Sequence, residues 1–300
     1  QLDFLGVVNA VQFSSLDLEL VRGSPGERRS WLDTLLTQLE PVYAYILQQY
    51  NTVLRQRNAL LKQQVKQWGA LGSQDNLGDA ADLAAGEGLD WELADLPAST
   101  NRDLTQLALW DAQLAAIGAR VIRRRARVIE RIAPLAQAWH QAISNQAELL
   151  EIRYAPNVAA MSDDPVLIQQ EFLEKLQRRM TAEQHQGTTL VGPHRDEVEF
   201  IINQTPARQY GSQGQQRTLV LALKLAELKL IEAVIGEPPL LLLDDVLAEL
   251  DLNRQNKLLE TIQDHFQTLI TTTHLGSFDA QWLKSSQILT VQAGQIQLGD

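Results

Sequence analysis

The stretch PPLLLLDDVLAELD, Pro238–Asp251, decides how the rest of the sequence is interpreted. The residues Leu240 to Leu243 follow one another without a polar break, and such a short apolar run predicts a strand buried on both faces. Asp244 and Asp245 come directly after it. Ligands bind at the carboxyl ends of strands in open α/β sheets, where one carboxylate can hold hydrated Mg²⁺ beside a nucleotide and the next can orient or deprotonate an attacking water. The alternative is a strand that ends at two turn-forming aspartates.

Length and composition are those of an ordinary globular protein. The 300 residues allow one or two domains with a sizeable core, and apolar and charged residues make up 45% and 21% of the chain. No apolar run approaches the ~20 residues that span a bilayer, and no secretory leader is visible, so we expect a cytoplasmic protein with no membrane contact. The net charge of −11 means that any contact with DNA requires a local basic patch. The absence of cysteine excludes disulfides and thiolate metal sites.

A second informative stretch is YGSQGQQRTLVLALKLAELKL, Tyr210–Leu230. A serine-glycine turn leads there into a helix predicted over Gln215–Ile235, with its apolar residues on one stripe and Gly236 at its end. The amino end of a helix binds phosphate through its unpaired N–H groups and partial positive charge. Gly214 lets the backbone approach a ligand closely, and Ser212 adds a hydroxyl donor. The alternative is a capped, buried helix in which Ser212 is only the cap.

Two further positions complete the set of candidate site residues. Asp251 ends the segment AELD, Ala248–Asp251, and could serve a ligand or merely cap the helix that follows. His274 follows the strand predicted at Thr268–Thr272 and could contact a terminal phosphate or a catalytic water. The alternative for this histidine is a solvated loop residue.

Helical patterns dominate residues 24–186. A capping box at Ser24–Glu27 starts a helix, and helical periodicity continues to about Trp68 with a restart at Pro41. Residues 101–151 are helical again, with apolar residues at every seventh position, which predicts a helix hairpin or a short coiled-coil arm. These residues are Leu114, Val121, Val128 and Leu135.

Between the two helical segments, residues 72–100 contain seven carboxylates and no Lys or Arg. Together with several glycines, this composition predicts a mobile acidic insert. It could be a solvated loop, a tail for a partner or a mimic of DNA.

A basic stripe lies on the second helical segment. Spacings of three and four residues place four arginines on one helix face, with two more beside them. The stripe could be a surface that tracks DNA phosphates or a solvated face that pairs with the acidic insert. Its members are Arg120, Arg124, Arg127 and Arg131, with Arg123 and Arg125 adjacent.

An α/β pattern follows from Thr188. Besides the leucine strand, it predicts helices over Asp164–Glu183 and from Leu252 to about Gln263, strands at Leu150–Tyr154, Leu190–Val191, Val198–Ile202 and Thr268–Thr272, and a hairpin near Ile288–Leu298. A parallel sheet built from these strands is incomplete.

Four of these motifs are the serine-glycine turn, the leucine strand with its two aspartates, the segment AELD and His274. In this order and spacing they resemble the C-terminal half of an ABC-type ATPase head of the SMC-like group. SQGQ resembles the ABC signature loop, and LLLLDD resembles Walker B with Asp245 where transporters have Glu. AELD resembles the D-loop, and His274 the switch histidine. Four longer stretches resemble the RecF family of bacterial recombination mediators, and this resemblance covers nearly the whole chain apart from the acidic insert. They are VVNAVQFSSLDLELVRGSPGERRSWLD, YNTVLRQRNALLK, TLVGPHRDEVEF and YGSQGQQRTLVLALKLAELK.

The resemblance implies an ATP-dependent homodimer that binds single-stranded and gapped double-stranded DNA. It further implies that the protein acts with RecO and RecR to load recombinase in replication, repair and the SOS response. The alternative is a non-hydrolysing interaction module that docks RecR or replication proteins.

The resemblance also implies residue roles. The signature loop of one subunit, Ser212, Gln213, Gly214 and Gln215, would cover ATP held by the other. Asp244 would hold Mg²⁺ through water, Asp245 would position the attacking water, and Asp251 and His274 would relay across the dimer. The candidate DNA surface rests on charge spacing alone and consists of Arg120, Arg123, Arg124, Arg127 and Arg131. His194, Arg195 and Asp196 match the family without an assigned role.

The predicted fold class is α/β, an ABC/SMC-like ATPase head with an incomplete mixed sheet and flanking helices, plus an α-helical arm domain. We expect residues 1–23 to be a remnant of the N-terminal head lobe, 24–186 the arm with the mobile insert 72–100, and 187–300 the C-terminal lobe. The sequence contains no GxxxxGK[ST] phosphate loop, which the family carries near its N-terminus. We therefore expect an N-terminally shortened chain that binds ATP poorly by itself, and slow DNA-stimulated ATPase activity only in the full-length protein.

Overall fold

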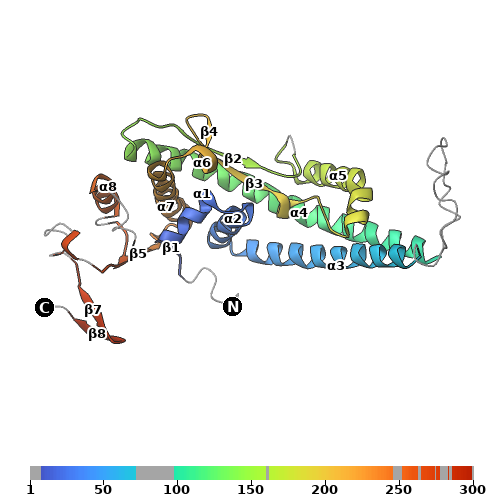
Figure 1. The fold of residues 1–300 in the computed structure, drawn as a ribbon, viewed down its shortest axis with the longest axis horizontal. Helices are drawn as coiled ribbons and strands as arrows, with labels where there is room; N and C mark the ends of the chain where they lie inside the picture. The colour runs from blue at the N-terminus through green and yellow to red at the C-terminus, as the bar shows by residue number, and fades with distance from the viewer. Residues whose placement is uncertain are drawn as a thin grey trace.

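A computed structural model describes residues 8–71, 98–159, 162–245, 252–262, 265–273, 275–277, 283 and 286–298. The molecule is elongated, because long helices extend to one side of a head that contains the parallel strands (Figure 1). Within these residues no helix is both long and apolar enough to cross a bilayer. Most of the expected acidic insert, residues 72–97, lies outside the described part of the chain.

The leucine run forms the central strand of a parallel sheet. This strand, β5 (Leu240–Asp244), lies between β1 (Ala10–Ser14) and β6 (Thr268–Thr271), so that the strand order is β1-β5-β6. Leu241 and Leu243 are buried, as the sequence predicts.

The prediction that this strand is buried on both faces is wrong. Leu240 and Leu242, which point to the opposite face of the pleat, are only half-buried. One face of β5 therefore packs in the core, and the other keeps partial contact with solvent.

The signature stretch forms the central helix of the head. Helix α7 (Gln213–Ile235) starts two residues earlier than predicted and ends at Gly236, whose φ of 86° is the left-handed conformation that glycine adopts without strain. It packs against β1 and the long helix α4 (Ala98–Ile143). Because neighbours surround it, most of its side chains are buried, including several outside the predicted apolar stripe.

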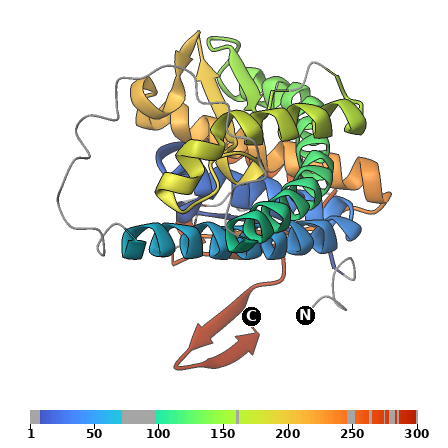
Figure 2. The same cartoon turned by 90° about the vertical axis from the view of Figure 1, so that its right-hand side faces the viewer.

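The arm is a pair of antiparallel helices with a third helix beside them (Figures 1 and 2). Helix α2 (Pro25–Leu39) leads into α3 (Val42–Leu71), which packs along α4, and α5 (Pro165–Gln186) packs on both. The heptad prediction is confirmed for α4, where the first three of its apolar positions are almost completely buried: Leu114, Val121 and Val128.

The remaining strands form two separate antiparallel sheets, so the main sheet itself is parallel rather than mixed in the described residues. The first sheet contains β2 (Leu150–Ala155), β3 (Glu197–Ile202) and β4 (Thr205–Pro206), and the second is the hairpin of β7 (Leu289–Gln292) and β8 (Gln295–Leu298). The other elements are short, apart from α8 (Leu252–Ile262): η2 (Ser15–Leu18), α1 (Glu19–Arg22), η4 (Pro193–Arg195), α6 (Ala207–Tyr210) and η6 (Leu275–Ser277).

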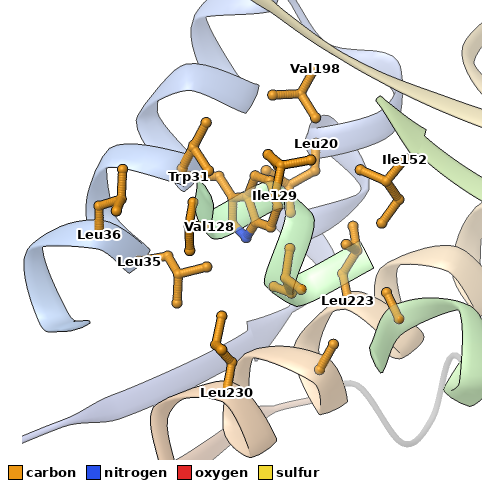
Figure 3. Packing of buried hydrophobic residues seen from close by; sticks show 14 of the residues in the cluster. Leu20, Trp31, Leu35, Leu36, Val128, Ile129, Ile152, Val198, Leu223 and Leu230 are labelled. Carbon is orange, nitrogen blue, oxygen red and sulfur yellow. The ribbon is translucent and has the colours of Figure 1, made fainter. Parts of the chain in front are cut away.

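One hydrophobic core joins the head to the base of the arm. In Figure 3, Trp31 of α2, Val128 and Ile129 of α4, and Leu223 and Leu230 of α7 converge on one another. Burying a side chain of this size stabilises the fold by about 1.5–3 kcal/mol. The packing of α4 on α7 therefore stabilises the junction between the head and the arm.

Two local predictions are wrong. Leu190–Val191 is not a strand, because side chains take over the backbone donors around it: Asn58 accepts from the Thr189 N–H and Glu183 accepts from the Leu190 N–H, both at 2.7 Å. At the start of α2, Ser24 occupies the N-cap position and Pro25 the first turn, but the Ser24 side chain makes no capping hydrogen bond.

Candidate functional site

The carboxyl edge of the parallel sheet brings together residues from three strands. In the sheet register Ser14 lies opposite Asp244, and Asp244 lies opposite Thr271. The hydroxyl of Thr271 donates to Oδ1 of Asp244 at 2.7 Å. Asp244 is exposed to solvent, as a ligand-binding carboxylate at this edge must be.

Asp245 forms a bend directly after β5. Its φ of 54° lies in the left-handed region, which aspartate tolerates better than most residues. Its N–H donates to the carbonyl oxygen and to the hydroxyl of Thr271, both at 3.2 Å. The side chain of Asp245 is exposed beside that of Asp244.

Asp244 fits a magnesium ion that is shared with phosphate and water. Mg²⁺ is usually held by one or two carboxylates plus phosphate oxygens, and Asp244 uses only Oδ1 in its bond with Thr271. Among the described residues, no group of three or more acidic or histidine side chains could hold a metal alone. Asp244 would be one ligand of such an ion.

The signature turn forms a complete capping box at the start of α7. The Ser212 hydroxyl accepts from the N–H of Gln215 at 3.2 Å, and the Gln215 side chain accepts from the N–H of Ser212 at 2.9 Å. Ser212 therefore caps α7. Ser212 and Gln213 are nevertheless exposed, and Gly214 is partly exposed, so the turn is open to a ligand from outside.

Gly211 shapes this turn by close backbone contact. A Cβ atom at this position would lie 2.6 Å from the carbonyl oxygen of Ala207, which the backbone could not accommodate without moving. Glycine is therefore required immediately before Ser212.

One copy of the chain keeps the signature turn apart from the aspartate pair. The sheet edge is linked to α7 by the ion pair between Lys224 and Asp17 at 3.0 Å, and Asp17 also accepts from the N–H of Ser14 at 2.7 Å. Lys224 lies three helical turns after Ser212, about 18 Å along the axis. Ser212 and Asp244 are therefore not placed to grip one triphosphate within a single copy.

Two of the predicted site residues cannot be placed. Asp251, with the rest of residues 246–251, and His274 lie outside the described residues.

The basic stripe on α4 is partly neutralised by the protein's own carboxylates. Arg123 and Arg127 both pair with Asp163, and Arg124 pairs with Glu40 at 3.0 Å. These three arginines are thus ion-paired within the chain, and their described partners do not come from the acidic insert.

The other members of the stripe behave differently. Arg120 and Arg131 are exposed and form no salt bridge with another described side chain. Arg131, with Arg124 and Arg127, lines a pocket of about 290 Å³ whose apolar lining includes Leu36 and Val128.

Arg125 does not belong to the exposed stripe. Its guanidinium is buried and donates to both oxygens of Asp33, to Oδ2 of Asp196 and to the carbonyl oxygen of Pro193. Sequence spacing alone places Arg125 beside the other arginines, but its neighbours in space come from α2 and η4. Its role is structural.

The motif that sequence reasoning left without a role, His194, Arg195 and Asp196, lies in this network, and Asp196 is its buried carboxylate. Asp196 accepts from the Tyr154 hydroxyl and from the N–H of Asn157, and Glu197 forms a bidentate pair with Arg28 at 2.6 and 2.8 Å. In the sequence, the only indication of this network is the run of charged and polar residues next to the predicted strand Val198–Ile202. Their partners lie far away in the sequence and could not be read from it.

His194 in the same motif is neutral. Its Nε2 lies 3.1 Å from the Thr189 carbonyl oxygen, and because a carbonyl only accepts, Nε2 carries the proton. Nδ1 then accepts from the Tyr50 hydroxyl at 2.7 Å. Burial lowers the pKa of His194 to about 4, since desolvation disfavours the charged ring, and the nearby Arg195 acts in the same direction.

A leucine strand that ends in two exposed carboxylates and a helix headed by an open serine-glycine turn are features expected of an ABC/SMC-like head fold. No family model matches the chain. The chain is 66% identical over 295 residues to the DNA replication and repair protein RecF of Cyanothece sp., covering 98% of this chain and 70% of the relative. It is 64% identical over 296 residues to RecF of Gloeothece citriformis, covering 99% of this chain and 72% of the relative. The chain therefore belongs to the RecF family of DNA replication and repair proteins.

Solved structures agree with this assignment. Two structures of the recombination mediator protein RecF in the RecFOR pathway, one described with ATPrS and one with ATP, match with TM-scores of 0.78 and 0.77. Each is 30% identical in sequence and covers 99% of this chain and 69% of the solved chain. The expected α/β fold class is confirmed.

Proposed function

We propose that this chain acts in recombinational repair as a nucleotide-dependent DNA-binding protein whose two copies close on shared ATP. The observation that carries the proposal is the separation of two exposed elements in one copy, the aspartate pair and the signature turn. A second copy related by two-fold symmetry can place its signature turn over the aspartate pair of the first. The structures of RecF described with ATP and ATPrS support a nucleotide as the shared ligand.

Each residue then has a chemical role. Ser212 would offer its hydroxyl proton and Gly214 its N–H to the terminal phosphate of the partner's nucleotide. Gln215 would have to release its capping bond with Ser212 before its own N–H could join them. Asp244 would hold Mg²⁺, which neutralises charge on the phosphates when bound. Asp245 would orient the attacking water, and Asp251 and His274 would connect the two sites across the dimer.

The DNA and protein partners are also proposals. Arg120 and Arg131, which have no described salt-bridge partner, are the best placed to contact DNA phosphates, and Arg123, Arg124 and Arg127 would have to exchange their carboxylates for phosphate. The solved relatives belong to the RecFOR pathway, which supports RecO and RecR as partners in loading recombinase at gapped or single-stranded DNA.

Asp245→Asn in the complete gene product tests the role of the second aspartate. Asparagine also tolerates the left-handed backbone at this position, so the turn should persist. ATP hydrolysis should fall by about 10²-fold or more, because water activation is lost, while ATP-dependent dimers accumulate. Glu237→Gln, which neutralises an exposed carboxylate before β5, is the matched control. Unchanged hydrolysis in Asp245→Asn would remove this residue from the mechanism.

One observation favours a second function, a non-hydrolysing interaction module. Ser212 and Gln215 satisfy each other in the capping box, as they would at a purely structural helix start. On this alternative, hydrolysis by the complete protein with gapped DNA would stay at background, while binding to RecR would persist.

A further inference from the structure

We infer that Thr271 is a positioning residue that holds both aspartates of the nucleotide site in their working geometry. This inference rests on the proposed function of Asp244 and Asp245. Thr271 ends β6 and lies opposite Asp244 in the sheet register, so its side chain reaches the aspartate pair from the neighbouring strand.

A single hydroxyl group serves both aspartates. Thr271 Oγ1 donates its proton to Oδ1 of Asp244 at 2.7 Å and lies 3.2 Å from the N–H of Asp245, from which it accepts. The carbonyl oxygen of Thr271 accepts from the same N–H at 3.2 Å. A hydroxyl can donate once and accept at the same time, so the two bonds are compatible.

The first bond fixes the carboxylate of Asp244. An exposed aspartate is otherwise free to rotate, and the donor on Oδ1 selects one orientation and leaves Oδ2 without a bond to Thr271. Hydrogen bonds that orient a metal-binding carboxylate typically change metal affinity or activity by about 10–100-fold. Thr271 would thus present Asp244 to the metal without touching the metal or the nucleotide.

The second bond holds the turn at Asp245. The left-handed φ of 54° is a conformation that a non-glycine residue keeps only when its surroundings support it. Both acceptors on Thr271 lie against the Asp245 N–H and supply that support. The direction of the Asp245 side chain therefore depends on a residue 26 positions further along the chain.

The test uses substitutions that separate the hydroxyl from the shape of the side chain. Thr271→Val keeps the β-branched form that suits a strand and removes the hydroxyl. Thr271→Ser keeps the hydroxyl and removes the methyl group. If Thr271→Val disturbs the circular dichroism spectrum, Thr271→Ala takes its place in the same measurement.

The readout is thermal stabilisation of the complete gene product by ATP, measured as Mg²⁺ is titrated, with hydrolysis measured in parallel. We expect Thr271→Val to raise the Mg²⁺ concentration at half-maximal stabilisation by about 10-fold or more. Stabilisation by ATP without Mg²⁺ should stay unchanged, and Thr271→Ser should stay close to the wild type. A wild-type-like Mg²⁺ midpoint in Thr271→Val would overturn the inference. A wild type that does not respond to ATP and Mg²⁺ would instead overturn the proposed function, and the inference with it.

Discussion

His194 of η4 is partly buried against α3, where Tyr50 and the Thr189 carbonyl hold it in the neutral form. Burial lowers its pKa to about 4, against about 6.5 for an unperturbed histidine. Between these two pH values the unfolded chain therefore binds more protons than the folded chain. The resulting stabilisation is complete above pH 6.5 and is lost as the pH falls towards 4.

We predict that this residue makes the protein less stable in mild acid. Between pH 7.5 and pH 5 the free energy of unfolding should fall by roughly 2 kcal/mol through His194 alone, within a maximum of roughly 3 kcal/mol for its full pKa shift. Urea denaturation at the two pH values measures this loss. His194→Gln, which does not titrate, should lose less stability over the same interval, and an equal loss in the variant and the wild type would show that other groups dominate. His185→Gln is the control for removal of a histidine on an outer helix.

At the scale of the element, α4 and α5 approach each other at Gly118. A Cβ atom added there would lie 2.5 Å from Cε2 of Phe172, whose ring is completely buried and cannot move away easily. Replacing glycine by alanine in a helix ordinarily stabilises by about 1 kcal/mol, whereas overpacking a core costs about 1–3 kcal/mol. The steric term should therefore outweigh helix propensity at this position.

Gly118→Ala should accordingly destabilise the protein by about 1–2 kcal/mol in chemical denaturation. Gly26→Ala is the matched control, because its nearest neighbour is only the flexible Ser24 hydroxyl at 3.1 Å. The control should be neutral or slightly stabilised. If Gly118→Ala is more stable than the wild type, α4 and α5 do not pack this closely at Gly118.

The arginines of α4 give a second prediction at this scale. Removing one protein–phosphate interaction on duplex DNA lowers the log–log slope of affinity against salt by about 0.9, so Arg120→Ala with Arg131→Ala should lower the slope by about 1.8. Fluorescence anisotropy over a salt series measures the slope. Arg55→Ala with Arg178→Ala removes the same charge from exposed positions elsewhere on the arm and should leave the slope almost unchanged. Equal slopes in both double variants would assign the stripe to a solvated face.

The sequence predicts elements well where periodicity and local chemistry agree. The leucine strand, the heptad positions of α4 and the capped start of α7 form within a residue or two of their predicted bounds. Prediction fails where a distant side chain replaces a backbone partner, as Asn58 and Glu183 do beside Leu190. It also fails for Arg125, whose spacing fits the exposed stripe but whose carboxylate partners come from α2 and from Asp196.

Some residues of the candidate site can likewise be predicted from the sequence, and others cannot. Asp244, Asp245 and Ser212 stand at exposed ends of elements, which the sequence indicates directly. The contribution of Thr271 depends on the order of strands, and no local pattern contains that information. The pairing of Arg123 and Arg127 with Asp163 likewise depends on how α5 docks on α4.

At the scale of the whole molecule, the head and the base of the arm share one packed core. The core shared by α2, α4 and α7 is continuous, and the buried partners of Arg125 join α2, α4 and η4. Close-packed interiors transmit displacement rather than absorb it. If the proposed contact of the signature turn with a nucleotide moves α7, the movement should therefore reach the arm and its arginines.

The most direct test of the central claim mixes two inactive variants of the complete gene product, Ser212→Arg and Asp245→Asn. If each site combines the aspartates of one copy with the signature turn of the other, a mixed dimer contains one intact site and one doubly altered site. We assume random exchange of subunits and independent sites. Half of the dimers are then mixed, and each mixed dimer has one intact site out of two, so mixing should restore about a quarter of wild-type ATP hydrolysis. Mixtures as inactive as either variant alone would contradict the proposal that two copies share the site.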